Sequence, residues 1–498
     1  MTPLHPGHLV MVDIEGKALS SVTAAFLRDN HIRAVCLFRK NLGTEAEVKQ
    51  LVADLREVLG PKALIGIDQE GGSVARATFL PQAPAAMALG AIADTAAAEE
   101  AAEATGAAVA RGLRGLGINW NFAPVLDVNS NPANPVIAER SFGADPQRVA
   151  RLAGAWMRGS LREGVACCVK HFPGHGDTHV DSHHALPTVD KSLAELEALE
   201  LIPFRALAAE APALMTAHIV YPQLDADHPA TLSRRILTGL LRDSLGYRGV
   251  VISDALMMKA IFDRYGHARG AVLTLAAGAD MALAQGRPED QLAAIRAVGD
   301  ALQDGRLDAG AMQAARERLD ALATGYPAAA APYAPPQRAN DEALMRAHWA
   351  RALTAFGGAT PPGVATPLRV VTQDRVDTDG VSEAGLGADE VAALFAGHAD
   401  VAFVRVPDLP RFDPATLPRD GRLTVLASNH RRRYAAPMAG WRPDLHLALW
   451  NPFQVADIGA PAVVTWGYAE GALAALRAWL EGAAAAPGVS PVALAPHA

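Results

Sequence analysis

Eight short apolar segments recur along the first 284 residues, and each is followed by a stretch long enough to form a helix. The segments have the length of β-strands and are mostly apolar rather than alternating, which is typical of strands buried on both faces of a parallel sheet. An open, doubly wound sheet is the alternative, but the count is eight and no G-x-G-x-x-G turn follows the first segment. The sequence therefore predicts an α/β fold whose strands close into a (β/α)8 TIM-like barrel. The segments are LVMVDI (9–14), AVCLF (34–38), ALIGID (63–68), INWNFAPV (118–125), ACCVKHF (166–172), ALMTAHIV (213–220), GVVISD (249–254) and ADMALA (279–284).

Helical stretches are expected between these strands, for example over 94–116, 145–163 and 191–208. The first of them opens with Asp94, and aspartate is a favoured residue at a helix N-cap.

The barrel-like periodicity ends near Thr324, where a Pro/Ala-rich segment, YPAAAAPYAPPQ, begins at residue 326. We predict three parts: a catalytic barrel over 1–325, a linker over 326–340, and a smaller α/β three-layer sandwich over 341–498.

The second domain is expected to start with a helix over 341–356 and to end with one over 471–482. Because no catalytic spacing stands out in it, packing, solubility or an oligomer contact is the role that its sequence favours. Its strands are expected to be LRVVT (368–372), VAFVRV (401–406), LTVLAS (423–428), LHLALW (445–450) and AVVTWG (462–467).

Charge and composition exclude several classes of partner. The chain carries 45 basic and 53 acidic residues, a formal charge of −8, and has no long basic run, so we expect no nucleic-acid or membrane partner. Its three cysteines lie in strand-like apolar runs and are expected to be buried free thiols. Neither a secretion signal nor an apolar run of membrane-spanning length is visible, which predicts a cytoplasmic protein.

Ionisable residues stand at the ends of several predicted strands. A barrel places its chemistry at the carboxyl ends of its strands, and a purely structural barrel would not need so many charged groups there. This distribution indicates an enzyme. The residues are Asp13, Arg39, Asp68, Asp127, Lys170, His171, His218 and Asp254.

The segment KHFPGHGDTHVDSHHALP (170–187) holds five of the sixteen histidines, and its proline and glycines favour an irregular loop. We weigh three interpretations: a metal site, a structural loop with satisfied histidines, and an acid/base dyad. In a dyad, a carboxylate two residues from an imidazole fixes one ring nitrogen and leaves the other to exchange a proton. Spacing alone leaves three pairs open, and they are Asp181–His183, Asp177–His179 and His175–Asp177.

The run RGVVISDALMMKAI (248–261) is expected to be a buried strand that ends at Ser253–Asp254. A carboxylate at the end of a barrel strand is well placed to attack an electrophilic carbon. Its other interpretation is an N-cap for the next helix. A carboxylate nucleophile and a separate proton donor are together the minimum apparatus for retaining glycoside hydrolysis.

The His-rich loop, taken with VISDALMMKAI, closely resembles glycoside hydrolase family 3, in its β-N-acetylglucosaminidase branch. The resemblance covers most of residues 9–300 and the end of the second domain. Supporting segments are GIDQEGGSVAR (66–76), NFAPVLDVNSNPANPVIAERSFG (121–143), TAHIVYPQLD (216–225), PATLSRRIL (229–237) and NPFQVADIGAPAVVTWGYAEGALAALRAWLEG (451–482).

This resemblance implies a retaining exo-glycosidase that releases N-acetylglucosamine from peptidoglycan or chitin fragments through a covalent intermediate, without a metal or organic cofactor. It implies that Asp254 is the nucleophile and that His183, oriented by Asp181, is the proton donor and later base. Ala255 follows the nucleophile where many members carry a second aspartate. Direct sugar contact is less expected for Asp127 and His218. The implied sugar-binding residues are Asp68, Arg76, Arg140, Lys170 and His171.

Several other functions remain open at this stage. They are a glycoside phosphorylase or a β-glucosidase on the same scaffold, a metal-dependent hydrolase that uses the His-rich loop, and a sugar-binding protein without turnover. Attack by the substrate's own acetamido oxygen is an alternative to attack by Asp254.

Overall fold

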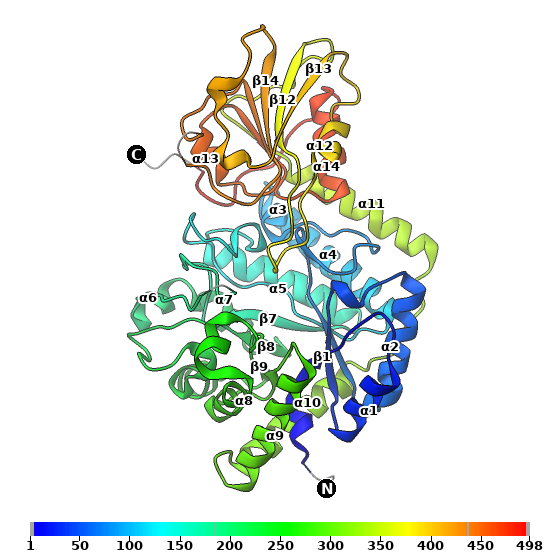
Figure 1. Ribbon diagram of the computed structural model, residues 1–498, viewed down its shortest axis with the longest axis vertical. Coiled ribbons are helices and arrows are strands. Elements are labelled where there is room, and N and C mark those ends of the chain that lie inside the picture. Colours follow the sequence, from blue (N-terminus) through cyan, green and yellow to red (C-terminus); the bar gives the residue numbers. More distant parts are fainter. Residues whose placement is uncertain (1–3, 184, 436–437, 495–498) are drawn as a thin grey trace.

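A computed structural model describes residues 4–183, 185–435 and 438–494. Figure 1 shows two bodies along the long axis of the molecule, a barrel and a smaller domain built on its own sheet. A two-stranded sheet, β4 (Gln69–Gly71) with β5 (Val74–Ala75), extends from one edge of the barrel.

Eight parallel strands form the barrel sheet in the order β10-β1-β2-β3-β6-β7-β8-β9. Ile252 at the end of β9 pairs in parallel with Met281, which directly precedes β10. The two ends of the sheet therefore meet, and the sheet closes on itself. The predicted barrel is confirmed, and each predicted segment contains one strand. The strands are β1 (Val10–Asp13), β2 (Ala34–Leu37), β3 (Leu64–Ile67), β6 (Trp120–Asn121), β7 (Ala166–Phe172), β8 (Ala213–Thr216), β9 (Val250–Ile252) and β10 (Ala282–Leu283).

Helices cover the outside of the barrel. Asp94 caps α4, as predicted, by accepting a hydrogen bond from the amide of Ala97 at 2.8 Å. The single helix predicted over 191–208 is wrong, because two helices occupy that range. Pro203 explains the break: it has no amide hydrogen to continue a helix and is tolerated only in a first turn. The helices are α1 (Ser21–Asp29), α2 (Glu45–Leu59), α3 (Ala86–Gly90), α4 (Thr95–Leu116), α5 (Pro146–Arg162), α6 (Leu193–Ala198), α7 (Leu201–Leu207), α8 (Lys259–Ala277), α9 (Pro288–Gln303) and α10 (Ala309–Gly325).

The second domain is built on a six-stranded sheet in the order β11-β16-β15-β14-β12-β13. Its strands pair in parallel except at the β11 edge, which is antiparallel. Helices α12 and α14 pack on one face of the sheet and α13 on the other, which gives the predicted three layers. The elements are β11 (Thr354–Phe356), β12 (Leu368–Gln373), β13 (Val401–Val406), β14 (Leu423–Ser428), β15 (Leu445–Ala448), β16 (Ala462–Val464), α12 (Ala388–Ala393), α13 (Gln454–Ile458) and α14 (Glu470–Leu480).

Helix α11 (Pro335–Ala352) starts earlier than the sequence predicts. The run Pro335–Pro336 stands at its first positions, where proline's fixed backbone angle suits a helix and no amide hydrogen is needed. The expected helix over 341–356 also ends too late, because residues 354–356 form β11 and pair with β16. The division into 1–325, 326–340 and 341–498 stays a prediction.

All three cysteines are free and buried, as the composition predicts. In the three ranges that the structure describes, no helix has the length and apolar character needed to span a bilayer.

Candidate active site

A cavity of about 790 Å³ lies at the carboxyl ends of the barrel strands. Barrel closure brings side chains from strands far apart in the sequence to this one rim. The predicted site residues Asp68, Arg76, Arg140, Lys170, His171, His183 and Asp254 all line the cavity.

Asp254 follows β9 directly, and helix α8 begins only at Lys259 with Met258 as its N-cap. The N-cap interpretation of Asp254 is therefore wrong. One carboxylate oxygen accepts a hydrogen bond from the amide of Ala255 at 2.8 Å. Burial alone would raise the pKa of Asp254, but three surrounding imidazoles and this amide outweigh it and lower the pKa to about 2. The imidazoles belong to His218, His171 and His183.

Asp181 and His183 form the hydrogen-bonded pair that one of the three open spacings predicts. Nδ1 of His183 lies 2.8 Å from Oδ1 of Asp181, and the same oxygen accepts from the backbone amide of His183 at 2.9 Å. These two bonds fix the ring against the carboxylate and direct its other nitrogen away from it. The side chain of His183 is 32% exposed, so a substrate in the cavity can reach it.

The other two spacings do not produce a dyad. Asp177 pairs with Lys191 at 2.7 Å instead of with a histidine. His179 bonds Asn131 at 3.2 Å. His175 lies buried with one ring nitrogen 3.0 Å from the hydroxyl of Ser182, and burial lowers its pKa to about 4. Tertiary contacts therefore single out Asp181–His183. We call Asp254, Asp181 and His183 the reaction side of the cavity.

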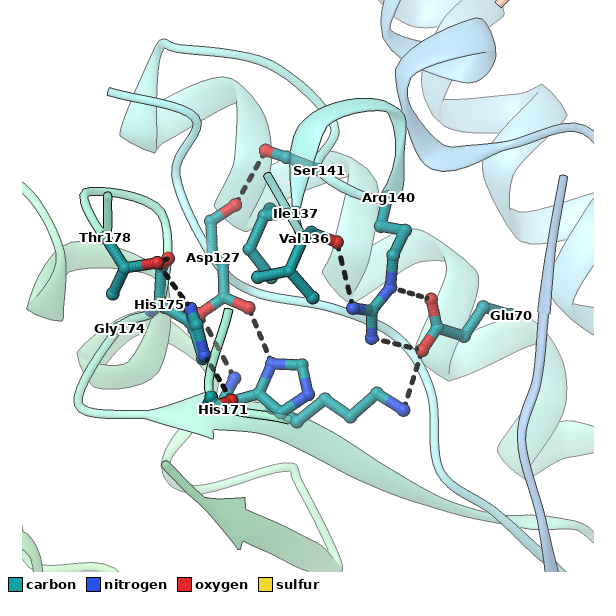
Figure 2. Close-up of polar contacts among 12 residues, drawn as sticks. Glu70, Asp127, Val136, Ile137, Arg140, Ser141, His171, Gly174, His175 and Thr178 are labelled. Atoms are coloured by element: carbon teal, nitrogen blue, oxygen red, sulfur yellow. Dashed lines mark hydrogen bonds and ion pairs between the residues drawn. The ribbon is translucent and has the colours of Figure 1, made fainter. Parts of the chain in front are cut away.

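A second group of charged side chains occupies another part of the cavity wall. We call Asp68, Glu70, Arg76, Arg140 and Lys170 the charged cluster. Arg140 makes a bidentate contact with Glu70 at 2.9 and 2.8 Å, which Figure 2 shows. Lys170 bridges Asp68 at 2.6 Å and Glu70 at 2.7 Å. The cluster's three cations face its two carboxylates and, through Arg76, the carboxylate of Glu383 at 2.9 Å, so three positive charges meet three negative ones in the wall.

Glu70 is a member of this cluster that the sequence analysis missed. Burial alone would raise its pKa, but Arg140 and Lys170 hold the pKa well below the ordinary value, so the carboxylate is ionised. The signal was present in the sequence, since Glu70 stands two residues after Asp68 in the segment GIDQEGGSVAR (66–76). Its role depends on partners 70 and 100 residues away, which spacing does not reveal.

Asp127 and His218 lie behind the cavity wall. Asp127 is fully buried and accepts from Nδ1 of His171 at 2.7 Å, an orientation visible in Figure 2. This bond leaves the other nitrogen of His171 for the cavity. His218 contacts the hydroxyl of Thr231 at 2.8 Å and the carbonyl of Ala255 at 3.0 Å, and burial lowers its pKa. Both residues support groups that line the cavity.

Among the described histidines of the loop, His171 and His175 lie edge to face with ring centroids 5.7 Å apart, and His179 and His183 bond Asn131 and Asp181. Within the described ranges, no three His, Cys, Asp or Glu side chains come together as a potential metal site. His184 lies outside those ranges.

The second domain supplies part of the cavity wall, a contribution that its sequence did not indicate. The segment between β12 and α12 descends toward the barrel (Figure 1), and its residues 378–381, 383 and 384 line the cavity. Within it, Glu383 pairs with Arg76 of the charged cluster at 2.9 Å. The role predicted for this domain, which was packing, solubility or an oligomer contact, is therefore incomplete.

A parallel barrel with an ionised carboxylate and a His–Asp pair on its rim defines a barrel enzyme with acid/base chemistry at its strand ends. The family model described as glycosyl hydrolase family 3 N terminal domain matches residues 4–322. The chain belongs to glycoside hydrolase family 3.

Three similar proteins illustrate how far the likeness extends. A β-hexosaminidase of Neisseria meningitidis serogroup C (strain 053442) is 40% identical over 292 residues, 58% of this chain and 80% of that protein. A family 3 β-N-acetylglucosaminidase of Paenibacillus sp. str. FPU-7 has 32% identity and a TM-score of 0.87, with 99% of both chains covered. Native NagZ of Neisseria gonorrhoeae has 35% identity and a TM-score of 0.54, covering 66% of this chain and all of that one.

Proposed function

We propose that this glycoside hydrolase is a retaining exo-β-N-acetylglucosaminidase that releases N-acetylglucosamine from the non-reducing ends of peptidoglycan or chitin fragments. The observation that carries the proposal is a single cavity lined by ionised Asp254 and by His183 of the Asp181–His183 pair. The names of its relatives, β-hexosaminidase and β-N-acetylglucosaminidase, support the choice of sugar.

In the proposed first step, a carboxylate oxygen of Asp254 attacks the anomeric carbon of the bound sugar. The bond from that carbon to the leaving oxygen breaks, and His183 gives its proton to the oxygen. A glycosyl ester on Asp254 and a neutral imidazole result. A low pKa suits Asp254 for this step, since the attacking group must be ionised at neutral pH.

In the proposed second step, neutral His183 takes a proton from water while the water oxygen attacks the same carbon. The ester to Asp254 breaks, and the configuration at the anomeric carbon is restored by the second inversion. Imidazole suits both steps because its protonated and neutral forms both exist near neutral pH. Asp181 keeps the ring in position throughout.

The proposed sugar contacts are Asp68, Arg76, Arg140, Lys170 and His171. Charged donors and acceptors with fixed positions make short, strong hydrogen bonds to ring hydroxyls. The charged cluster has this character because its ion pairs hold each side chain in place. With Glu383 paired to Arg76, the positive and negative charges of this wall balance, which suits the binding of a neutral sugar.

An activity panel tests the proposal. We expect p-nitrophenyl N-acetyl-β-glucosaminide to be hydrolysed, with much slower turnover of the glucoside and the N-acetylgalactosaminide. Added phosphate should leave the rate unchanged and give no sugar 1-phosphate, and exhaustive chelation should leave activity intact. A phosphate-dependent rate would indicate a phosphorylase, and a loss on chelation would indicate a metal-dependent enzyme.

Covalent trapping tests the nucleophile. A 2-deoxy-2-fluoro sugar with a good leaving group should label Asp254, which peptide mass spectrometry would locate. If the enzyme turns over but no ester forms at this residue, attack by the substrate's acetamido oxygen becomes the better mechanism.

We also propose a cytoplasmic location. Three buried free cysteines support a reducing compartment, because free thiols in an oxidising one tend to form disulfides.

A further inference from the structure

The wall segment 378–384 of the second domain is attached firmly to the barrel. Val381 is 5% exposed, and the amide of Glu383 donates a hydrogen bond to the carbonyl of Ser73 at 2.9 Å. The segment is therefore a fixed part of the cavity. The barrel side chains that share an apolar cluster with Val381 are Val74, Val136 and Ile137.

Arg431 of the second domain joins the same two surfaces. One of its terminal nitrogens lies 3.2 Å from a carboxylate oxygen of Asp379 and 3.3 Å from the hydroxyl of Ser382. The other donates to the carbonyl of Val136, in the barrel, at 2.7 Å. Because a single guanidinium holds both sides, the position of the wall relative to the barrel rim is well defined.

In Glu383, another residue of this wall, one carboxylate oxygen is available to a ligand. Its Oε1 accepts from Arg76 at 2.9 Å, and the hydroxyl of Tyr468 donates to its backbone carbonyl at 3.0 Å. Within the described ranges, its Oε2 takes part in no hydrogen bond. The side chain lines the cavity and is 24% exposed, so a ligand there can reach it.

We infer that Glu383 is a specificity-determining residue that accepts a hydrogen bond from one hydroxyl of the terminal sugar. The segment 378–384 then stops a glycan from continuing past that sugar. This inference rests on the proposed function and deepens it. A sugar attached at the recognised hydroxyl would remove the donated hydrogen and would collide with the wall. The second domain in this way selects an unsubstituted chain end.

Deoxy substrates can identify this contact. We expect Glu383→Ala to lower kcat/KM for p-nitrophenyl N-acetyl-β-glucosaminide by about 10- to 100-fold, the worth of a hydrogen bond to a charged group. For one of the 3-, 4- and 6-deoxy analogues, wild type and variant should differ by less than about 3-fold, since the partner hydroxyl is already missing. Glu383→Gln should recover part of the lost activity because its amide oxygen can still accept.

The matched control is Asp389→Asn, which changes an acid to an amide at an exposed site of the same domain, where it pairs with Arg405. We expect its kcat/KM to equal that of wild type on every substrate. If Glu383→Ala loses the same factor on the parent and on all three deoxy analogues, Glu383 acts only by positioning Arg76 and the inference is wrong.

A crystal structure of wild type with bound N-acetylglucosamine gives a second test that needs no variant. We expect a sugar hydroxyl within about 3.2 Å of a carboxylate oxygen of Glu383. A bound sugar with no oxygen within reach of Glu383 would overturn the inference while leaving the proposed hydrolysis intact. Absence of wild-type turnover on the parent substrate would instead reject the proposed function.

Discussion

The reaction side and the charged cluster of the cavity hold their ionisable groups in opposite ways. On the reaction side, His183 is partly exposed and pairs with one carboxylate, that of Asp181. In the charged cluster, the side chains of Lys170 and Arg140 are 2% and 5% exposed, and both contact Glu70. His183, the proposed proton donor, must gain and lose its charge during each cycle, so it needs access to water and substrate.

The side chains of the charged cluster, which we propose as sugar contacts, need charges that do not change. Burial among opposite charges provides this, because removing one member would leave its partners uncompensated in a poorly solvated site. We therefore expect substitutions on the reaction side to lower mainly turnover, and substitutions in the charged cluster to lower the stability of the fold as well. Four predictions test this difference.

The largest effect is expected at Asp254. Asp254→Asn removes the attacking oxygen while preserving shape, so kcat for the aryl N-acetylglucosaminide should fall by about 10⁴-fold or more. Steady-state kinetics measure this loss. The control is Asp263→Asn on the exposed surface of α8, which should retain wild-type kcat. Turnover of Asp254→Asn within 10-fold of wild type (a threshold of about 1.4 kcal/mol in barrier) would contradict the assignment.

The next effect is expected at His183 and depends on the leaving group. His183→Ala should lower kcat/KM by about 10²- to 10³-fold for chitobiose, whose leaving oxygen needs a proton. For a dinitrophenyl glycoside, the same substitution should lower the rate of the bond-breaking step far less. Asp181→Asn should show the same pattern at smaller amplitude, because the ring is still present but less well oriented. Equal losses for both leaving groups would argue against proton donation by His183.

In the charged cluster, Glu70→Gln should lower the free energy of unfolding by about 3 kcal/mol at pH 7, since Arg140 and Lys170 would lose a buried partner. Denaturant unfolding measures the change. The control is Glu103→Gln, which breaks an exposed pair with Arg162 and should cost less than about 1 kcal/mol. Similar small losses for both variants would show that the cluster contributes little to folding.

The stability difference between wild type and Glu70→Gln should depend on pH in a defined way. The pKa of Glu70 is lower in the folded chain than its ordinary value, because Arg140 and Lys170 outweigh the effect of burial. Its stabilising contribution is therefore present above the unfolded pKa and is lost as pH falls toward the folded one. The difference in the free energy of unfolding between wild type and Glu70→Gln should therefore decrease below about pH 4.5, the ordinary pKa of a glutamate side chain.

The smallest expected effect concerns pH and Asp254. Because its pKa is about 2, the carboxylate stays ionised as the pH falls from 7 to 4. The rate of covalent labelling by a fluorosugar with fluoride as leaving group should therefore change by less than about 2-fold over that range. A labelling rate that falls with a midpoint near pH 4 would show that Asp254 is not held in its ionised form.

The barrel was predictable because its signal is local. A strand buried on both faces must be largely apolar, and most residues of each predicted strand segment are apolar. The wrong or missing predictions concern residues whose structure or role depends on contacts with residues distant in the sequence. Residues 354–356 are helical by local pattern but pair with the edge of β16. Glu383 has no neighbouring motif, and its place in the cavity wall is revealed by its ion pair with Arg76, 307 residues away in the sequence.

The barrel, the buried thiols and the chemical groups at the strand ends could be predicted from consecutive residues, because hydrophobic periodicity and strand position are local properties of the chain. The folded structure was needed to show which carboxylate orients which histidine, how Glu70 binds the cations around it, and that the second domain forms part of the cavity wall. Hydrogen bonds and ion pairs act over a few ångströms in space, and residues separated by hundreds of positions come within that range only after the chain has folded.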